Sequence, residues 1–148
     1  ERVNLAVSTD LPPNRVQVGN YHYFRRKVTN NTGAPITKLR LRVAAITTLF
    51  GVGYNPGVQA DWRGITSPDA VLNLPGPLTV TAKGLTLEAP SVAYSATGKG
   101  AGYNASFTVD LSDIGGSLAN GASIYLNIGF RNVKGGSFNW VLVPEFMN

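Results

Sequence analysis

The most constraining feature of this chain is a strict alternation of apolar and basic residues within one stretch. The alternating residues are Lys38, Leu39, Arg40, Leu41, Arg42 and Val43. A period of two places one set of side chains on each face of a β-strand. A second run alternates in the same way from Ile124 to Phe130, and no stretch shows a convincing helical period. The chain is therefore predicted to consist of strands that each bury one face.

Turn-forming residues separate these apolar runs. The chain has 17 glycines and nine prolines among 148 residues, and 43% of its residues are hydrophobic. This length and composition suit one domain with a substantial core and many corners. We predict an all-β fold, an antiparallel β-sandwich of Ig-like or jelly-roll-like form with about 8–10 strands.

The order of strands and turns predicts particular pairings. Two pairs of neighbouring runs are expected to form antiparallel hairpins: residues 20–29 with 36–48, and residues 123–131 with 137–143. Three short runs separated by Gly- and Pro-containing turns are expected to form a meander: residues 70–74, 78–82 and 85–88.

The start of the chain differs from the remainder. Residues 1–19 are predicted to form an N-terminal arm on a single sandwich domain, residues 20–148. Pro12 and Pro13 are expected to end the arm's strand, because proline cannot donate a hydrogen bond to a β-ladder. The strand is either an edge strand of its own sandwich or one that pairs with a neighbouring subunit. In the second case its contact residues are Val3, Leu5 and Val7.

The first predicted hairpin would gather five cations on one exposed face: Arg25, Lys27, Lys38, Arg40 and Arg42. Like charges that face each other destabilise a sheet, so this basic contact face is expected to meet an anionic partner. The net charge of +5 arises because acidic residues are few. A nucleic acid would need aromatic stacking partners, whereas an anionic polysaccharide or an acidic patch on another subunit needs only the charge. We favour the second kind of partner and expect no nucleic acid.

Residues 49–68 form a long aromatic segment, which either caps one end of the core or binds a ligand. As a binding loop it would contribute Tyr54 and Trp62, together with Tyr103, as rings that stack on sugars. Asp61 and Arg63 would then bind sugar hydroxyls. This interpretation makes the protein a carbohydrate-binding module.

Catalytic and metal-binding chemistry receives little support from the residue types. The chain has no cysteine and one histidine, His22, so no thiolate site, His-based metal site or Ser–His triad can be built. Asp110 and Asp113 either bind Ca²⁺ through oxygen or form Asx turns. No apolar run approaches the roughly 20 residues of a membrane span. We expect a protein that is not an enzyme and has no cofactor.

Residues 29–43 read TNNTGAPITKLRLRV. They resemble a module of secreted and surface proteins of bacteria, in which the pattern is close to NNTGAPITRLRFRV. The resemblance resumes at residues 84–88 and at Pro90, and again at residues 120–124 and 134–138, so it covers most of residues 20–143 with gaps. It implies an extracellular β-sandwich and carries over no catalytic residue.

These observations predict a secreted structural or interaction protein whose signal peptide has been removed. The hypothesis is a subunit of an extracellular filament, sheath or surface assembly, built from copies of itself. Residues 1–10 would add a strand to the sheet of a neighbour. A carbohydrate-binding module that uses the aromatic loop residues is the alternative.

Overall fold

The computed structural model describes residues 2–3, 6–48, 54–88 and 105–148, and only the backbone of those before residue 13. Strands dominate these residues, with one short 3-10 helix, η1 (Ser112–Ile114). The strands are β1 (Arg2–Val3), β2 (Ala6–Val18), β3 (Tyr21–Asn30), β4 (Lys38–Ile46), β5 (Asp61–Ile65), β6 (Ala70–Leu74), β7 (Leu78–Gly84), β8 (Thr86–Glu88), β9 (Ser106–Val109), β10 (Ser123–Lys134) and β11 (Trp140–Met147).

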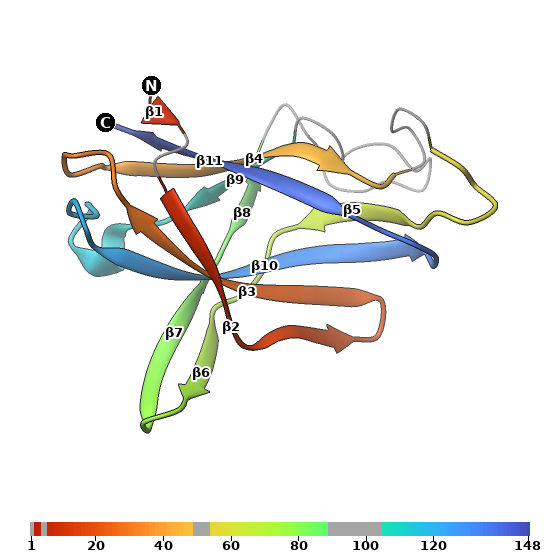
Figure 1. Cartoon of the computed structure of the whole chain (residues 1–148), viewed down its shortest axis with the longest axis horizontal. Helices are drawn as coiled ribbons and strands as arrows, with labels where there is room; N and C mark the ends of the chain where they lie inside the picture. Colours follow the sequence, from red (N-terminus) through yellow and green to blue (C-terminus); the bar gives the residue numbers. More distant parts are fainter. Residues whose placement is uncertain (1, 4–5, 49–53, 89–104) are drawn as a thin grey trace.

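The strands form two stacked sheets, which are the upper and lower layers of Figure 1. The five-stranded sheet has the order β1-β11-β4-β9-β8. The six-stranded sheet has the order β2-β3-β10-β7-β6, and β5 also pairs with β10. The described strand pairs are antiparallel, except that β7 runs parallel to β10. The predicted all-β sandwich is thus confirmed.

The core lies between the two sheets and follows the alternation in the sequence. Leu39, Leu41 and Val43 of β4 are buried from one side. From the other side β10 buries four residues in the same alternating pattern: Ile124, Leu126, Ile128 and Phe130. Each such side chain contributes about 1.5–3 kcal/mol when it is fully buried, so these two strands supply much of the stability of the sandwich.

Both predicted hairpins are wrong. β3 pairs with β2 and β10, whereas β4 pairs with β11 and β9 in the other sheet. β10 and β11 are likewise divided between the two sheets. A strand with one apolar face buries that face against the opposite sheet, whichever strands pair with its two edges. Alternation therefore predicts the buried face of a strand but not its neighbour.

The predicted meander is correct only for its first two strands. β6 and β7 form an antiparallel pair that projects from the sandwich (Figure 1). Leu72 and Ala82 are buried in a small cluster on this pair. The third strand, β8, pairs with β9 in the five-stranded sheet, so the chain changes sheets between β7 and β8.

The paired prolines interrupt β2 without ending it. β2 pairs with β3 as far as Asp10, and the pairing resumes at Arg15. Residues 11–14 bulge opposite Arg25, whose Nη1 donates a hydrogen bond of 3.3 Å to the carbonyl oxygen of Pro13. The expectation that the strand stops at the prolines is therefore wrong, because an edge strand accommodates proline in a bulge.

Candidate functional site

One edge of the sandwich is formed by the short β1 and by β11 in the upper layer, and by β2 in the lower layer (Figure 1). β11 pairs with β4 along its whole length, whereas β1 pairs only with Glu145 and Phe146 on its other side. Within the described parts of the chain, no strand pairs with the outer side of residues 140–144. An edge of this kind presents backbone N–H and C=O groups that another strand can use.

The arm takes part in both sheets at this edge. β1 places Val3 opposite Glu145 of β11, and β2 places Val7 opposite Thr29 of β3. Leu5 lies outside the described residues. The arm is thus paired within its own chain, as the edge-strand interpretation expects. Residues 2–3 of the arm pair in the five-stranded sheet, and residues 6–10 pair in the six-stranded sheet.

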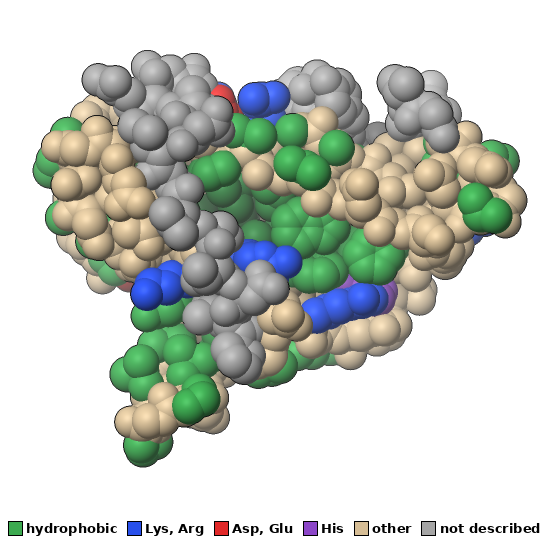
Figure 2. All heavy atoms as spheres, viewed as in Figure 1, with side chains coloured by type: hydrophobic (Ala, Val, Ile, Leu, Met, Phe, Trp, Pro, Cys, Tyr) green, Lys and Arg blue, Asp and Glu red, His purple; other side chains and the backbone are tan. Residues whose placement is uncertain are grey.

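Aromatic side chains line a hollow between β11 and β2, where Figure 2 shows hydrophobic groups gathered. Phe138 stacks on Trp62 with 3.8 Å between the ring centroids and 12° between the planes. Phe24 meets Trp140 edge-on at 5.0 Å. Such aromatic pairs add about 0.5–1.5 kcal/mol beyond the area that they bury. Phe138 and Trp140 are only partly buried, so the core reaches the surface here.

Two arginines lie over these rings. The guanidinium carbon of Arg15, on β2, is 5.0 Å from the ring centroid of Phe138. That of Arg26, on β3, is 5.3 Å from the centroid of Trp140 and 5.7 Å from that of Phe24. A cation over an aromatic face gains about 0.5–2 kcal/mol. The hollow therefore combines an apolar lining with a positive charge on its β2–β3 side.

The histidine lies at the inner end of this arrangement. His22 is buried, and its ring centroid is 4.5 Å from that of Trp62. Arg15 donates from Nη2 to Nδ1 of His22 at 2.9 Å, because a guanidinium has no acceptor. Burial, and secondarily the charge of Arg15, lowers the pKa of His22. The ring is thus held neutral as part of the core.

The predicted basic contact face is not assembled. Arg25 and Lys27 are on the outer side of the six-stranded sheet, whereas Lys38, Arg40 and Arg42 are on the outer side of the five-stranded sheet. These sides face in opposite directions. This separation follows from the missing hairpin, and it removes the repulsion that close pairing of the two strands would create.

Most of these cations also have partners in the fold. Arg25 is buried, and its Nε donates to Oδ1 of Asn127 at 2.9 Å. Oε1 of Glu145 lies 2.9 Å from Nε of Arg40 and 3.8 Å from Nε of Arg42. Lys38 is exposed and Lys27 is half-buried. The three arginines therefore make contacts within the fold, and the five basic residues do not form one surface for an anion.

The predicted sugar platform is also not assembled. Trp62 is 1% exposed and offers no open face to a sugar, because its ring is packed in the hydrophobic core. Asp61 and Arg63 are buried and form an ion pair, with 2.9 Å between Oδ1 and Nε. Tyr54 is half-buried, and Tyr103 lies outside the described residues. The described part of residues 49–68 covers the core, as the capping interpretation expects.

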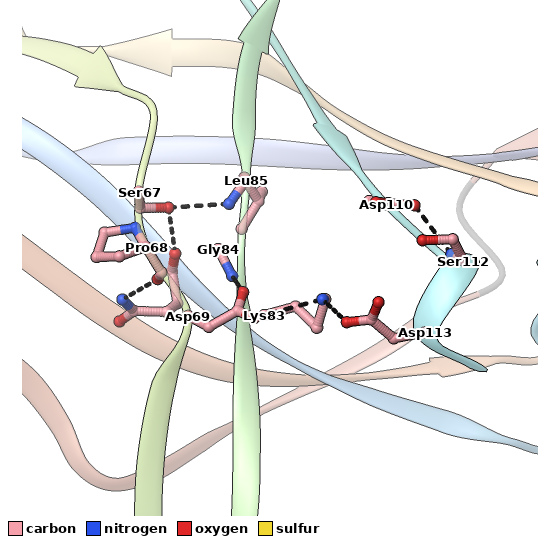
Figure 3. Close-up of polar contacts among 10 residues, drawn as sticks. Ser67, Pro68, Asp69, Lys83, Gly84, Leu85, Asp110, Ser112 and Asp113 are labelled. Atoms are coloured by element: carbon pink, nitrogen blue, oxygen red, sulfur yellow. Dashed lines mark hydrogen bonds and ion pairs between the residues drawn. The ribbon is translucent and has the colours of Figure 1, made fainter.

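The two aspartates considered as calcium ligands take part in turn and ion-pair contacts (Figure 3). Oδ1 of Asp110 accepts a 2.9 Å hydrogen bond from the backbone N–H of Ser112, which lowers the pKa of the Asp110 carboxyl. Asp113 pairs with Lys83, which also lies 3.4 Å from Asp69. The described residues contain no group of three or more His, Asp or Glu side chains that could hold a metal ion.

Sequence reasoning missed the two arginines of the hollow. For Arg26 a signal exists, since it stands two residues from both Phe24 and Val28 and so shares their core-facing side. For Arg15 no comparable signal exists, because the bulge after Asp10 shifts the register of β2. The position of a bulge depends on the partner strand, which the local sequence does not specify.

Comparison with family models, curated proteins and solved structures gave no match for this chain. Among the residues that the structure describes, no helix is long and apolar enough to cross a membrane. The functional argument therefore rests on the geometry of the β11–β2 edge.

Proposed function

We propose that this protein is a secreted, non-catalytic structural subunit that assembles with copies of itself outside the cell. Neighbouring copies exchange the first ten residues of the arm. One observation carries the proposal: β1 lies along β11 in one sheet, and β2 lies along β3 in the other. A single short segment thus contributes to one edge of both sheets, and its pairing is interrupted at the prolines before the domain begins.

Exchange of this segment between copies costs few contacts. The pairings of β1 with β11 and of residues 6–10 with β3 are the same whether the segment belongs to the same chain or to another. The bulge at residues 11–14 supplies the place where the chain changes direction. Each copy then has one segment to donate and one edge that accepts it, and this head-to-tail contact propagates into a filament or sheet.

The accepting edge suits strand addition. Backbone groups of β11 provide hydrogen bonds, and the aromatic hollow beside it provides apolar contact for alternate side chains of an added strand. In the arm, Val3 stands opposite Glu145 of β11 and Val7 opposite Thr29 of β3, so each sheet receives one of these two apolar residues. The main-chain hydrogen bonds of the added strand supply affinity in this mode of association.

The extracellular location in this proposal is supported by the resemblance of residues 29–43 to exported bacterial modules. The composition of the chain agrees with self-association, since only 14% of its residues are charged and interface cores are depleted in charge. A non-catalytic role is supported by His22, whose ring is buried and stacked in the core.

The test compares the full chain with a variant that lacks residues 1–10. We expect the full chain to form oligomers that grow with concentration, measured by light scattering and seen by electron microscopy. The shortened variant should remain monomeric and should bind a synthetic peptide of residues 1–10 added in trans. A peptide of scrambled order is the control for the ligand, and Val71→Ser, at an exposed position of the β6–β7 pair, is the control for the protein.

Two results would overturn the proposal. One is a full-length protein that stays monomeric at every concentration, and the other is assembly that does not change when residues 1–10 are removed. If the shortened variant is unfolded alone, recovery of its β-sheet circular dichroism with the peptide, and not with the scrambled peptide, still supports the proposal. Failure of both peptides would count against it.

A further inference from the structure

Arg26 has an unusual position for a charged residue. It stands on the core-facing side of β3 between Phe24 and Val28, which are 7% and 3% exposed. Its guanidinium lies over the rings of Phe24 and Trp140, and its Nη1 donates to the backbone oxygen of Arg25 at 3.1 Å. A charge on the inner side of a sheet is costly unless an opposite charge accompanies it.

The register of β2 against β3 brings an acidic residue to this position. Asp10 stands directly opposite Arg26, and it is the last paired residue before the bulge. It is also the only acidic residue among positions 2–10 of the chain. A slip of one residue would place Thr9 or Leu11 opposite Arg26 and would turn every side chain of the strand to the other face.

We propose that the opposite charges at positions 10 and 26 fix the register in which the arm of one copy enters the sheet of the next. This inference rests on the proposed function, and it identifies the residues that make the contact specific. The main-chain hydrogen bonds of an added strand supply affinity but little discrimination between neighbouring registers. Asp10 stands opposite the charge of Arg26 in only one of these registers. A single polar contact can specify register in this way, at some cost in stability.

The local geometry fixes the place of the Arg26 guanidinium. The rings of Phe24 and Trp140 come from different sheets, so they hold the guanidinium between the two layers at the edge of the hollow. Arg15 is the second cation there, but it follows the prolines and remains with its own chain when residues 1–10 are exchanged. Asp10 precedes the prolines, so the acidic residue that stands opposite Arg26 belongs to the exchanged segment.

The test uses charge reversal in the full-length protein. Asp10→Arg and Arg26→Asp should each raise the critical concentration for assembly by about tenfold or more, because like charges meet in every contact. An equimolar mixture of the two variants should assemble as the unaltered protein does, because each segment then finds an opposite charge only in the other variant. Lys27→Asp, one residue away on the outer side of β3, is the matched control and should assemble normally.

The double variant Asp10→Arg/Arg26→Asp separates pairing between copies from pairing within one copy. If the inference is correct, it assembles alone, as does the mixture of single variants. Rescue in the double variant without rescue in the mixture would overturn the inference, because the charges would then act only within one chain. Normal assembly of both single variants would also overturn it and leave the proposed function intact. Failure of the unaltered protein to assemble would instead reject the proposed function.

Discussion

At the scale of single residues, His22 couples the stability of the hollow to pH. Burial first, and the charge of Arg15 second, lowers its pKa below the ordinary value of about 6.5. Between its folded and unfolded pKa values the unfolded state binds more protons, so stability increases with pH there. The contribution of His22 is therefore complete above about pH 6.5. It is lost as the pH falls through the interval toward the folded pKa.

We accordingly expect the free energy of unfolding to fall on acidification below about pH 6.5, by at most about 1.4 kcal/mol per pH unit from this residue. His22→Gln removes the titration, so its stability should depend less on pH over the same interval. Urea denaturation of both proteins at several pH values below about 6.5 measures the difference between their free energies of unfolding. The contributions of the other titrating groups are common to both proteins and cancel in this difference. Parallel pH profiles for the two proteins would contradict the assignment.

Single positions also show what the sequence can predict. The burial of Leu39, Leu41 and Val43 follows from their alternation, because that pattern reflects which side of a strand faces the core. The burial of Trp62 does not follow. An aromatic residue in a long segment between strands suits a binding loop as well as a core, and only the pairing of β5 with β10 decides between them.

At the scale of elements, the change of sheet between β7 and β8 depends on Gly84. A Cβ atom at this position would lie 2.0 Å from the carbonyl oxygen of Ser67. The backbone N–H of Gly84 donates to Oδ1 of Asp69 at 2.8 Å, and that of Leu85 donates to Oγ of Ser67 at 3.0 Å (Figure 3). These contacts fix the segment before β6 against the end of β7, so neither backbone can move aside easily.

Gly84→Ala is therefore expected to lower the free energy of unfolding by about 3 kcal/mol, at the upper end of the usual range for overpacking. Gly135→Ala is the matched control, since a Cβ there meets nothing within 4 Å, and it should change stability by less than about 0.5 kcal/mol. Chemical denaturation measures both. Equal effects of the two substitutions would show that the close approach at Gly84 does not limit the fold.

Strand existence was predictable from the sequence, whereas strand pairing was not. The turn at residues 31–35 reads as a hairpin turn, yet it connects β3 in one sheet to β4 in the other. The same ambiguity separated β10 from β11. The predicted basic contact face depended on the first hairpin. Because that hairpin does not form, the five cations are divided between the two sheets. The hollow could not be predicted either. Its residues come from β2, β3, β5, β11 and a position outside any strand, Phe138, and local patterns do not bring these together.

At the scale of the whole molecule, both sheets join strands that are distant in the sequence. β10 pairs with β3 through Ser123 and Thr29, and β11 pairs with β4 through Trp140 and Ile46. Such pairings close large loops before they gain contacts, and this slows folding. β11 follows β4 only after most of the chain, so the edge that receives β1 forms only after this distant strand has docked. Until then, the arm has no complete edge in its own chain.

This delay predicts that oligomer yield depends on the protein concentration during refolding. Closure of the arm on its own chain is independent of concentration, whereas pairing with another copy becomes faster as concentration rises. Samples refolded at high concentration should therefore contain more exchanged oligomers than samples refolded when dilute. Light scattering after adjustment to one common concentration measures this difference. The variant lacking residues 1–10 should show no such dependence, and an identical size distribution for all full-length samples would mean that the arm always closes on its own chain first.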